Sequence, residues 1–283
     1  MLRRILVGID STQSSVAALH FGIVWARQHG ATLVGLAIVD EPGIRAIEPV
    51  WPVGGTPGSD PVYYMGYEPR LAAVHERAQE ALAQFATLCD EEGVAHTEIK
   101  RTGSPHEQFC EEAQSCDLIL IGRGSQFRFI AGDDEGDETV KQVLKNACRA
   151  VVVVPLPSAG EGPIVIAYDG SHQAHHALTA FRATGLGKSH PVYILSIGAD
   201  VAQAAERAEK ARAFLSEHGI AAVPQPLVTS QRIGEAILEH TSRLNASLLV
   251  MGAYGKPALR EFFLGSVTRK LLEEASVPLF LSH

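Results

Sequence analysis

Short apolar runs alternate with longer segments that carry apolar residues at helical spacing along the 283-residue chain. Runs of this length, rich in Val, Ile and Leu, predict buried strands, and the segments between them predict amphipathic helices. The predicted strands are residues 5–10, 32–39, 95–101, 117–121 and 150–154 in the first half, and 164–169, 191–197, 221–229, 247–251 and 277–281 in the second. Because strands that alternate with helices form βαβ units, the pattern predicts parallel sheets with helices on both faces.

The second half of the chain repeats the order of the first. Asp10 closes the first predicted strand of one half and Asp169 closes that of the other, and the helices that follow align at the same offset. A repeat of this length indicates two domains and not a solenoid. The Pro- and Gly-rich segment 155–163 is the expected linker between them. The predicted domains are residues 1–157 and 162–283.

A glycine pattern follows the fourth predicted strand of the second half. Gly252, Gly255, Gly265 and Ser266 form Gly-x2-Gly-x9-Gly-Ser directly after Met251. Glycines let a ligand approach the backbone without a Cβ in the way, and the free N–H groups of a helix start favour an anion such as phosphate. Ser266 is expected to cap that helix. Turn glycines and an ordinary cap would explain the same residues without a ligand.

This spacing, continued by Val267 and Thr268, resembles the nucleotide-binding signature of the universal stress protein family. The internal repeat extends the resemblance over nearly the whole chain, which is therefore identified as a tandem member. The resemblance implies an α/β fold of two Rossmann-like, adenine-nucleotide alpha-hydrolase-like domains, each with a five-stranded parallel sheet flanked by helices. It also implies ATP as the ligand, with Mg²⁺ accompanying it, pairing of the two domains through their fifth strands, and a further pairing of whole chains into a homodimer.

The resemblance also assigns parts of the nucleotide to residues of the second half. Asp169 would contact the adenosine, Ile197 would pack on the base, and the glycine loop with Ser266 would hold the phosphates. The predicted nucleotide-binding residues are Ala167, Asp169, Ile197, Met251, Gly252, Gly255, Gly265, Ser266, Val267 and Thr268. No catalytic residue is predicted, because none of these is an obvious base for water, and any ATP turnover is expected to be slow.

The first half departs from the signature. It keeps Asp10, which is expected to remain able to meet adenosine, and Gly122-Arg-Gly124, but Asp137-Glu138 align with Gly265-Ser266. The surrounding loop also contains Asp133, Asp134 and Glu135, and this charge is expected to repel phosphate. The sequence therefore predicts one nucleotide per chain.

An insertion at residues 41–69 distinguishes the first half further. It is rich in Pro and includes the aromatic residues Trp51, Tyr63, Tyr64 and Tyr67, just before a helix predicted near 71–92. A loop of this length is expected to cover the crevice of the first domain, to form a subunit contact, or to be flexible. Farther along, Ser104-Pro-His-Glu107 predicts a helix start with a capping box.

Composition limits the partners and the location. A net charge of −8 argues against nucleic acid or an anionic membrane surface as a partner. No apolar stretch approaches a bilayer span and no segment resembles a signal peptide, so the cytoplasm is the expected location. Cys89, Cys110, Cys116 and Cys148 are expected to be small buried hydrophobes. His172, His175 and His176 are expected to be surface residues and not zinc ligands.

Three functions remain open at this point. The first is an ATP-binding regulator of a stress response, and the second is a slow ATPase or an adenylating enzyme on a related fold. The enzymes of that second class carry Ser-Gly-Gly-x-Asp-Ser after their first strand, which neither Asp10-Ser-Thr-Gln nor Asp169-Gly-Ser-His matches. The third is a scaffold that binds no nucleotide and acts through a partner surface.

Overall fold

The computed structural model describes residues 1–46, 67–127, 136–156, 162–253 and 265–282. These residues form a ten-stranded sheet with the order β3-β2-β1-β4-β5-β10-β9-β6-β7-β8. The strands are β1 (Arg4–Gly8), β2 (Thr32–Val39), β3 (His96–Thr102), β4 (Leu118–Gly122), β5 (Val151–Val154), β6 (Ile164–Ala167), β7 (Val192–Ile197), β8 (Ala222–Leu227), β9 (Leu248–Gly252) and β10 (Leu279–Ser282).

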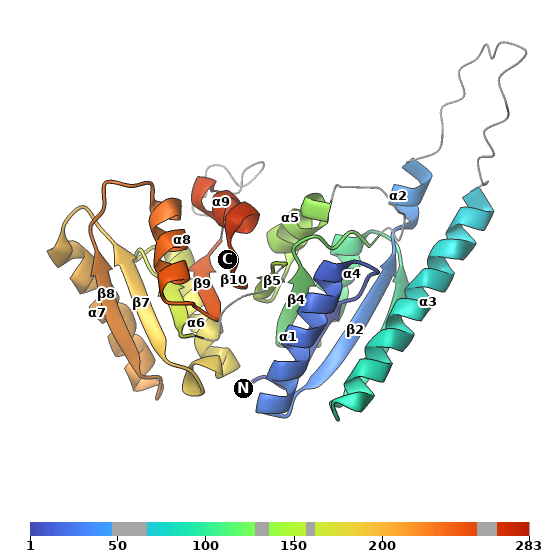
Figure 1. Ribbon diagram of the computed structural model, residues 1–283, viewed down its shortest axis with the longest axis horizontal. Coiled ribbons are helices and arrows are strands. Elements are labelled where there is room, and N and C mark those ends of the chain that lie inside the picture. The colour runs from blue at the N-terminus through green and yellow to red at the C-terminus, as the bar shows by residue number, and fades with distance from the viewer. Residues whose placement is uncertain (47–66, 128–135, 157–161, 254–264, 283) are drawn as a thin grey trace, which may run out of the picture.

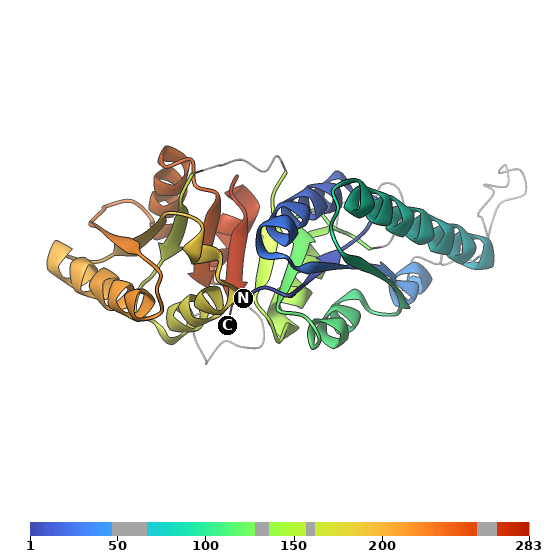
Figure 2. The same cartoon turned by 90° about the horizontal axis from the view of Figure 1, so that it is seen from below.

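Helices cover both faces of this sheet, as Figures 1 and 2 show. They are α1 (Gln13–His29), α2 (Glu41–Ala46), α3 (Tyr67–Glu91), α4 (Pro105–Ala113), α5 (Gly136–Asn146), α6 (His172–Thr184), α7 (Val201–Glu217), α8 (Ile233–Arg243) and α9 (Ser266–Glu274), with a 3-10 turn η1 (Leu186–Lys188) after α6. Every strand pair within a half is parallel. The predicted pair of five-stranded parallel sheets flanked by helices is confirmed.

The two halves meet where β5 pairs with β10, and this pairing is antiparallel. Leu279 lies opposite Val153, Phe280 opposite Val152, and Leu281 opposite Val151. Figure 1 shows the two strands side by side at the centre of the molecule. The predicted pairing of the fifth strands within one chain is confirmed, and we call it the seam.

Side chains along each strand of the seam point alternately into two apolar cores. Val152 and Phe280 join the cluster beneath α1, α3, α6 and α7, whereas Val153 and Leu279 join the cluster beneath α4, α5, α8 and α9. Phe280 also meets Phe181 of α6 edge to face, with ring centroids 6.1 Å apart. Because side chains of a strand point alternately to opposite faces, each strand of the seam contributes to both cores.

Local signals in the sequence explain the ends of several helices. Thr12 caps α1 by accepting a hydrogen bond from the Ser15 N–H, and Ser171 caps α6 by accepting one from the Ala174 N–H. The expected capping box at Ser104 is wrong in part. The helix α4 does begin at Pro105, but the Ser104 hydroxyl bonds His106 Nδ1 at 2.8 Å and makes no cap hydrogen bond. A neighbouring side chain has taken the place of the backbone N–H as its partner.

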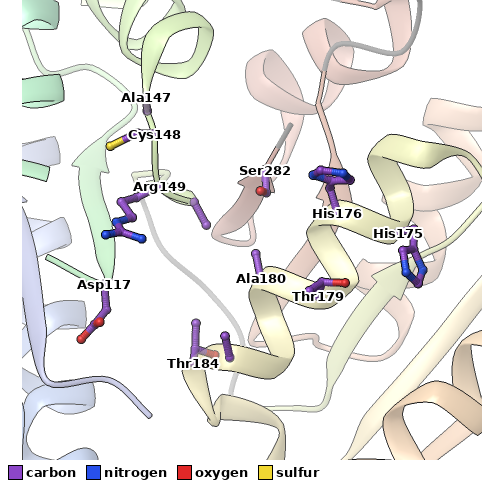
Figure 3. A pocket seen from close by; sticks show the side chains of 12 residues that line it. Asp117, Ala147, Cys148, Arg149, His175, His176, Thr179, Ala180, Thr184 and Ser282 are labelled. Carbon is purple, nitrogen blue, oxygen red and sulfur yellow. The ribbon is translucent and has the colours of Figure 1, made fainter. Parts of the chain in front are cut away.

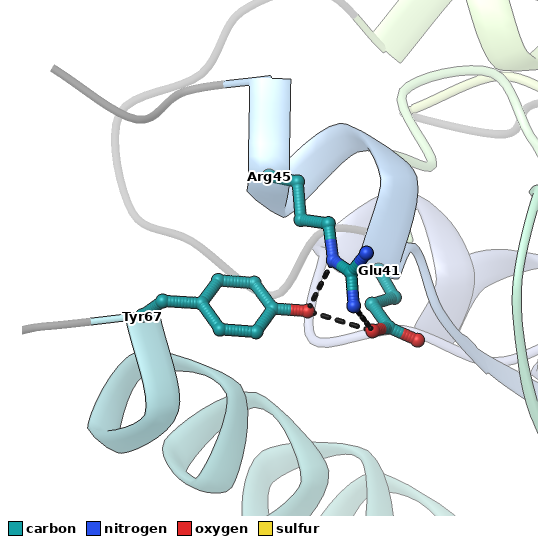
Figure 4. Close-up of polar contacts among 3 residues, drawn as sticks. All are labelled: Glu41, Arg45 and Tyr67. Carbon is teal, nitrogen blue, oxygen red and sulfur yellow. Dashed lines mark hydrogen bonds and ion pairs between the residues drawn. The ribbon is translucent and has the colours of Figure 1, made fainter. Parts of the chain in front are cut away.

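The insertion at 41–69 is partly helical, which corrects the expectation of a loop. Residues 41–46 form α2, and α3 begins at Tyr67 instead of near residue 71. Tyr67 donates to Glu41 Oε1 at 2.7 Å, and Arg45 donates to both Tyr67 Oη at 2.9 Å and Glu41 Oε1 at 2.7 Å (Figure 4). The hydrogen bond from Tyr67 lowers the pKa of Glu41. These contacts join the two ends of the insertion, whereas Trp51, Tyr63 and Tyr64 lie outside the described residues.

Among the residues that the structure describes, no helix combines the length and the apolar character needed to cross a membrane.

The seam predicts how the halves behave when they are separated. Residues 1–156 alone would leave the outer edge of β5 unpaired, and residues 162–283 alone would leave the outer edge of β10 unpaired. Because an open apolar edge strand is a template for pairing, each half should self-associate or precipitate. Mixing the halves should restore a complex of the size of the intact chain, measured by size-exclusion chromatography with light scattering. Halves that stay monomeric and soluble would contradict this.

Candidate functional site

The predicted nucleotide-binding residues that the structure describes gather at one edge of the second half of the sheet. Ala167 is the last residue of β6, Ile197 the last of β7, and Gly252 the last of β9. The strand β6 pairs with β7 on one side and β9 on the other. The chain order therefore reverses across β6, and the carboxyl ends of strands at such a reversal form the crevice where α/β sheets bind ligands.

An apolar wall, partly open to solvent, lines this edge. Ala167, Ile197 and Val267 are half-buried and pack against the same core cluster, and Met251, at 7% exposure, belongs to that cluster. Leu227 at the end of β8 is a further half-buried member, which the sequence reasoning missed. Its position opposite Ile197 in the ladder of β7 and β8 could have indicated it. A half-buried apolar surface at a crevice is suited to the face of an aromatic base.

Asp169 follows β6 by two residues and is exposed. Its Oδ1 accepts a hydrogen bond from the Ser171 N–H at 2.9 Å, across Gly170, whose φ is +79°. A glycine suits this left-handed conformation, which a side chain would strain. The turn thus fixes the carboxylate at the mouth of the crevice while leaving it accessible to water.

The two described glycines of the signature have different structural roles. A Cβ on Gly252 would lie 2.5 Å from the backbone C of Gln173 and 2.7 Å from the N of Ala174, so β9 can approach the start of α6 only at a glycine. A Cβ on Gly265 would meet nothing nearer than Thr268 Oγ1 at 4.0 Å. Packing therefore explains Gly252, whereas no described residue crowds Gly265. Gly255 lies outside the described residues.

The first turn of α9 corrects one expectation. Gly265 is the N-cap residue, with an extended backbone at φ −54° and ψ 146°, and Ser266 is the first helical residue. Ser266 therefore does not cap the helix. Both residues are exposed, whereas Thr268 is 5% exposed. The first N–H groups of a helix have no partner within the helix, so this exposed turn has the donors and the dipole that favour an anion.

Known protein families and solved structures resemble this chain over nearly its whole length. The model of the universal stress protein family matches residues 1–155 and again 162–283. The chain belongs to the universal stress protein family. The universal stress protein Slr1230 of Synechocystis is 24% identical over 208 residues, which cover 72% of this chain and 71% of that protein. A universal stress protein of Thermus aquaticus is 32% identical over 135 residues, covering 42% of this chain and 96% of its own length.

A solved universal stress protein of Archaeoglobus fulgidus has the same fold over nearly the full length. The match has a TM-score of 0.70 and covers 98% of this chain and 97% of that one, at 18% sequence identity. Its extent agrees with the tandem arrangement that the two family matches show.

The corresponding crevice of the first universal stress protein domain is filled by the protein itself. The registers of β1 with β2 and of β6 with β7 make Gly8 the counterpart of Ala167 and Ile38 the counterpart of Ile197. Gly8 and Ile38 are buried, whereas their counterparts are half-open. Something therefore covers the first crevice that does not cover the second.

The cover is the side chain of Phe127, together with Phe109 of α4. A Cβ on Gly8 would lie 2.7 Å from the Cζ atoms of both rings, and these rings meet edge to face with centroids 5.2 Å apart. Phe127 is fully buried, although its φ of +56° is unusual for a bulky residue. Burial of an aromatic ring at this position offsets the strain of that backbone conformation.

Asp10 is engaged by the same loop, which corrects the expectation that it could meet adenosine. It is 4% exposed, and its Oδ2 accepts the Gln126 N–H at 2.8 Å while its Oδ1 accepts from the N–H and the hydroxyl of Thr12. Of the acidic residues expected to exclude phosphate, 133–135 lie outside the described residues, and Asp137 and Glu138 lie in the first turn of α5. In the described part of the first domain, the obstacle to a base is a packed side chain.

A separate groove of about 560 Å³ lies between the two halves, away from both crevices (Figure 3). Its walls are α6, with His176 and Thr179, and the segment before β5, with Cys148 and Arg149. Within the described part of the chain, none of the predicted nucleotide-binding residues lines it. The groove is not the predicted site.

The cysteines and histidines also differ in part from expectation. Cys89 and Cys116 are buried, and burial raises the pKa of the Cys89 thiol to about 11. Cys110 is only half-buried and Cys148 is exposed, so these two are not core residues. The exposed rings of His172 and His176 lie 4.4 Å apart on α6. The described residues contain no group of three or more side chains that could hold a metal ion.

Replacing Phe127 with Ala tests whether its ring fills the first crevice. The change should lower the free energy of unfolding by about 3–5 kcal/mol, because a fully buried aromatic ring leaves a cavity. Phe127→Leu, which keeps most of the apolar volume, should cost less than half as much. Urea denaturation followed by circular dichroism would measure both. A loss below about 1 kcal/mol for Phe127→Ala would show that the ring does not support the domain.

Proposed function

We propose that this chain is a cytoplasmic ATP-binding regulatory protein that holds one adenine nucleotide in its second domain. The observation that carries the proposal is the contrast between the two crevices. One edge of the second domain combines a half-open apolar wall, an exposed carboxylate and an exposed helix start at Gly265, which no described side chain crowds. In the first domain, aromatic side chains and a buried acid occupy the matching positions.

Each part of the nucleotide has a chemically suitable partner at this edge. The base would pack on Ala167 and Ile197, where removal of apolar surface from water favours binding. The exposed carboxylate of Asp169 would accept hydrogen bonds from the ribose hydroxyls. The phosphates would meet the N–H groups and the positive dipole end of α9, beginning at Gly265, where the missing side chain permits close approach.

Mg²⁺ would enter the site with the phosphates. This ion keeps several of its waters and is commonly held by substrate phosphates with few protein ligands. The absence of a ligand group among the described side chains is compatible with that mode of binding.

Regulation suits these residues better than catalysis. Asp169 is placed for the ribose end of the ligand, and the described residues at the start of α9 are Gly265, Ser266, Val267 and Thr268, none of which is a strong base. Among these described residues none is a base at the phosphate end of the site, and phosphoryl transfer without a positioned base would lack part of its usual stabilisation. A protein that binds ATP and hydrolyses it slowly can change its conformation with the concentration of ATP.

Titration calorimetry with ATP tests the proposal directly. The intact chain should bind one ATP per chain, and Gly265→Asp should abolish binding, because it adds both a side chain and a negative charge beside the phosphates. Phosphate release measured on the same samples should be slow. Two sites per chain, or unchanged binding by Gly265→Asp, would contradict the proposal. A chain that binds no adenine nucleotide would support a scaffold function instead.

A pair of alanine variants separates binding from folding. Gly265→Ala should leave the melting temperature within about 2 °C, since the new methyl group meets no atom of the described residues closer than 4.0 Å, yet it should weaken ATP binding about tenfold. Gly252→Ala should lower the melting temperature, because its methyl group would collide with the start of α6. Thermal melts and calorimetry on both variants provide the comparison. If Gly265→Ala binds ATP as tightly as the unmodified chain does, the phosphates do not bind beside Gly265.

A further inference from the structure

Arg123 connects the first domain to the helix that begins at the proposed phosphate site. It directly follows β4, and its backbone N–H donates to the Val154 carbonyl at 2.8 Å. Its side chain crosses to the second domain, where Nη1 donates to the carbonyls of Leu272 at 3.3 Å, Glu273 at 3.2 Å and Ala275 at 2.8 Å. All three carbonyls lie at the carboxyl end of α9.

That end of α9 needs an external partner. The last carbonyls of a helix have no intrahelical donors, and they carry the negative end of the helix dipole. The last turn of α9 ends in Glu273 and Glu274, which are unfavourable there, and its C-cap residue Ala275 is extended at φ −65° and ψ 133°. Arg123 therefore supplies from the other domain the donors and the positive charge that the last turn of α9 lacks.

The backbone that carries the Arg123 side chain is itself held in place. The segment from Gly122 to Phe127 forms a turn in which the Ser125 N–H donates to the Gly122 carbonyl at 3.1 Å. At the far end of the segment, the Gln126 N–H bonds Asp10 and the Phe127 ring is buried over Gly8. The loop that fills the first crevice thus also holds Arg123 against the second domain.

We propose that Arg123 is a positioning residue for the nucleotide site of the second domain. This inference rests on the proposed function. The carboxyl end of α9 is held by Arg123, and the face of α9 toward the core is held by the buried side chains of Leu271 and Leu272. The amino end, with Gly265 and Ser266, is then presented in a fixed orientation, and a site held in its binding geometry spends less ordering entropy on its ligand.

The coupling is reciprocal and runs along one helix. If the contact of Arg123 increases the affinity of the second domain for ATP, then bound ATP stabilises the contact of Arg123 by the same factor. Binding of ATP to the second domain would therefore strengthen the contact between Arg123 and α9. The counterpart of Arg123 in the second domain, by the registers of β4 and β9, is Ala253, which has no side chain to make the reverse contact. The ATP site and the first-domain loop that carries Arg123 would therefore be energetically coupled.

Calorimetry and hydrogen exchange on the full chain test this role. Arg123→Ala should raise the Kd for ATP about five- to tenfold with one site per chain retained, and should speed amide exchange in α9 before ATP is added. Arg123→Lys keeps the charge and one donor group and should recover part of the affinity. Arg27→Ala, which removes an exposed ion pair with Glu92 of the first domain, is the matched control and should change neither measurement.

The outcomes separate this inference from the function on which it rests. Unchanged ATP affinity of Arg123→Ala, with or without faster exchange in α9, would overturn the positioning role and leave nucleotide binding intact. A loss of affinity shared equally by Arg27→Ala would also overturn it. Failure of the unmodified chain to bind ATP would overturn the proposed function, and the positioning role with it.

Discussion

The antiparallel pairing of β5 with β10 is the interaction on which the rest of the structure depends. Each strand is a short apolar edge that would be exposed in an isolated half, and their pairing covers both edges at once. It also joins the cores, because alternate residues of each strand enter the clusters on the two faces of the sheet. The direction of the pairing has a further consequence. The carboxyl end of β5 lies beside the start of β10, which brings Arg123, at the end of the neighbouring β4, to the carboxyl end of α9.

The two domains share a fold but have different crevices. In the second domain the carboxyl ends of β6 and β7 remain half-open, and in the first the matching positions are buried by aromatic rings. Burial of a ring such as that of Phe127 contributes roughly 1.5–3 kcal/mol, which is enough to offset a strained backbone conformation. The first domain thus has internal packing at the place where the second domain has a half-open apolar surface. The same loop provides the contact to α9, so one segment both fills the crevice and joins the domains.

The glycine signature combines folding and binding requirements that a sequence motif cannot separate. Gly252 is required where β9 approaches the start of α6, whatever the ligand. Among the described residues, none would collide with a Cβ at Gly265, so their packing does not require a glycine there. A residue that the fold does not require, at an exposed helix start beside an apolar wall, is therefore the more informative member of the motif. This distinction depends on neighbours from α6, which the spacing of glycines does not reveal.

The sequence by itself determined the elements, their alternation and the tandem repeat, because these follow from local apolar periodicity and from the offset between Asp10 and Asp169. The pairing of the fifth strands was expected only from the family resemblance, and the structure shows it. Tertiary structure decided which polar groups bond and which surfaces stay open. The sequence suggested a free Asp10, yet its carboxylate bonds Gln126, 116 positions away. It placed the cap of α9 on Ser266, and it offered no signal for the contact of Arg123 with Ala275, 152 positions away. Periodicity is a property of neighbouring residues, whereas a hydrogen bond chooses among all partners that the fold brings within reach.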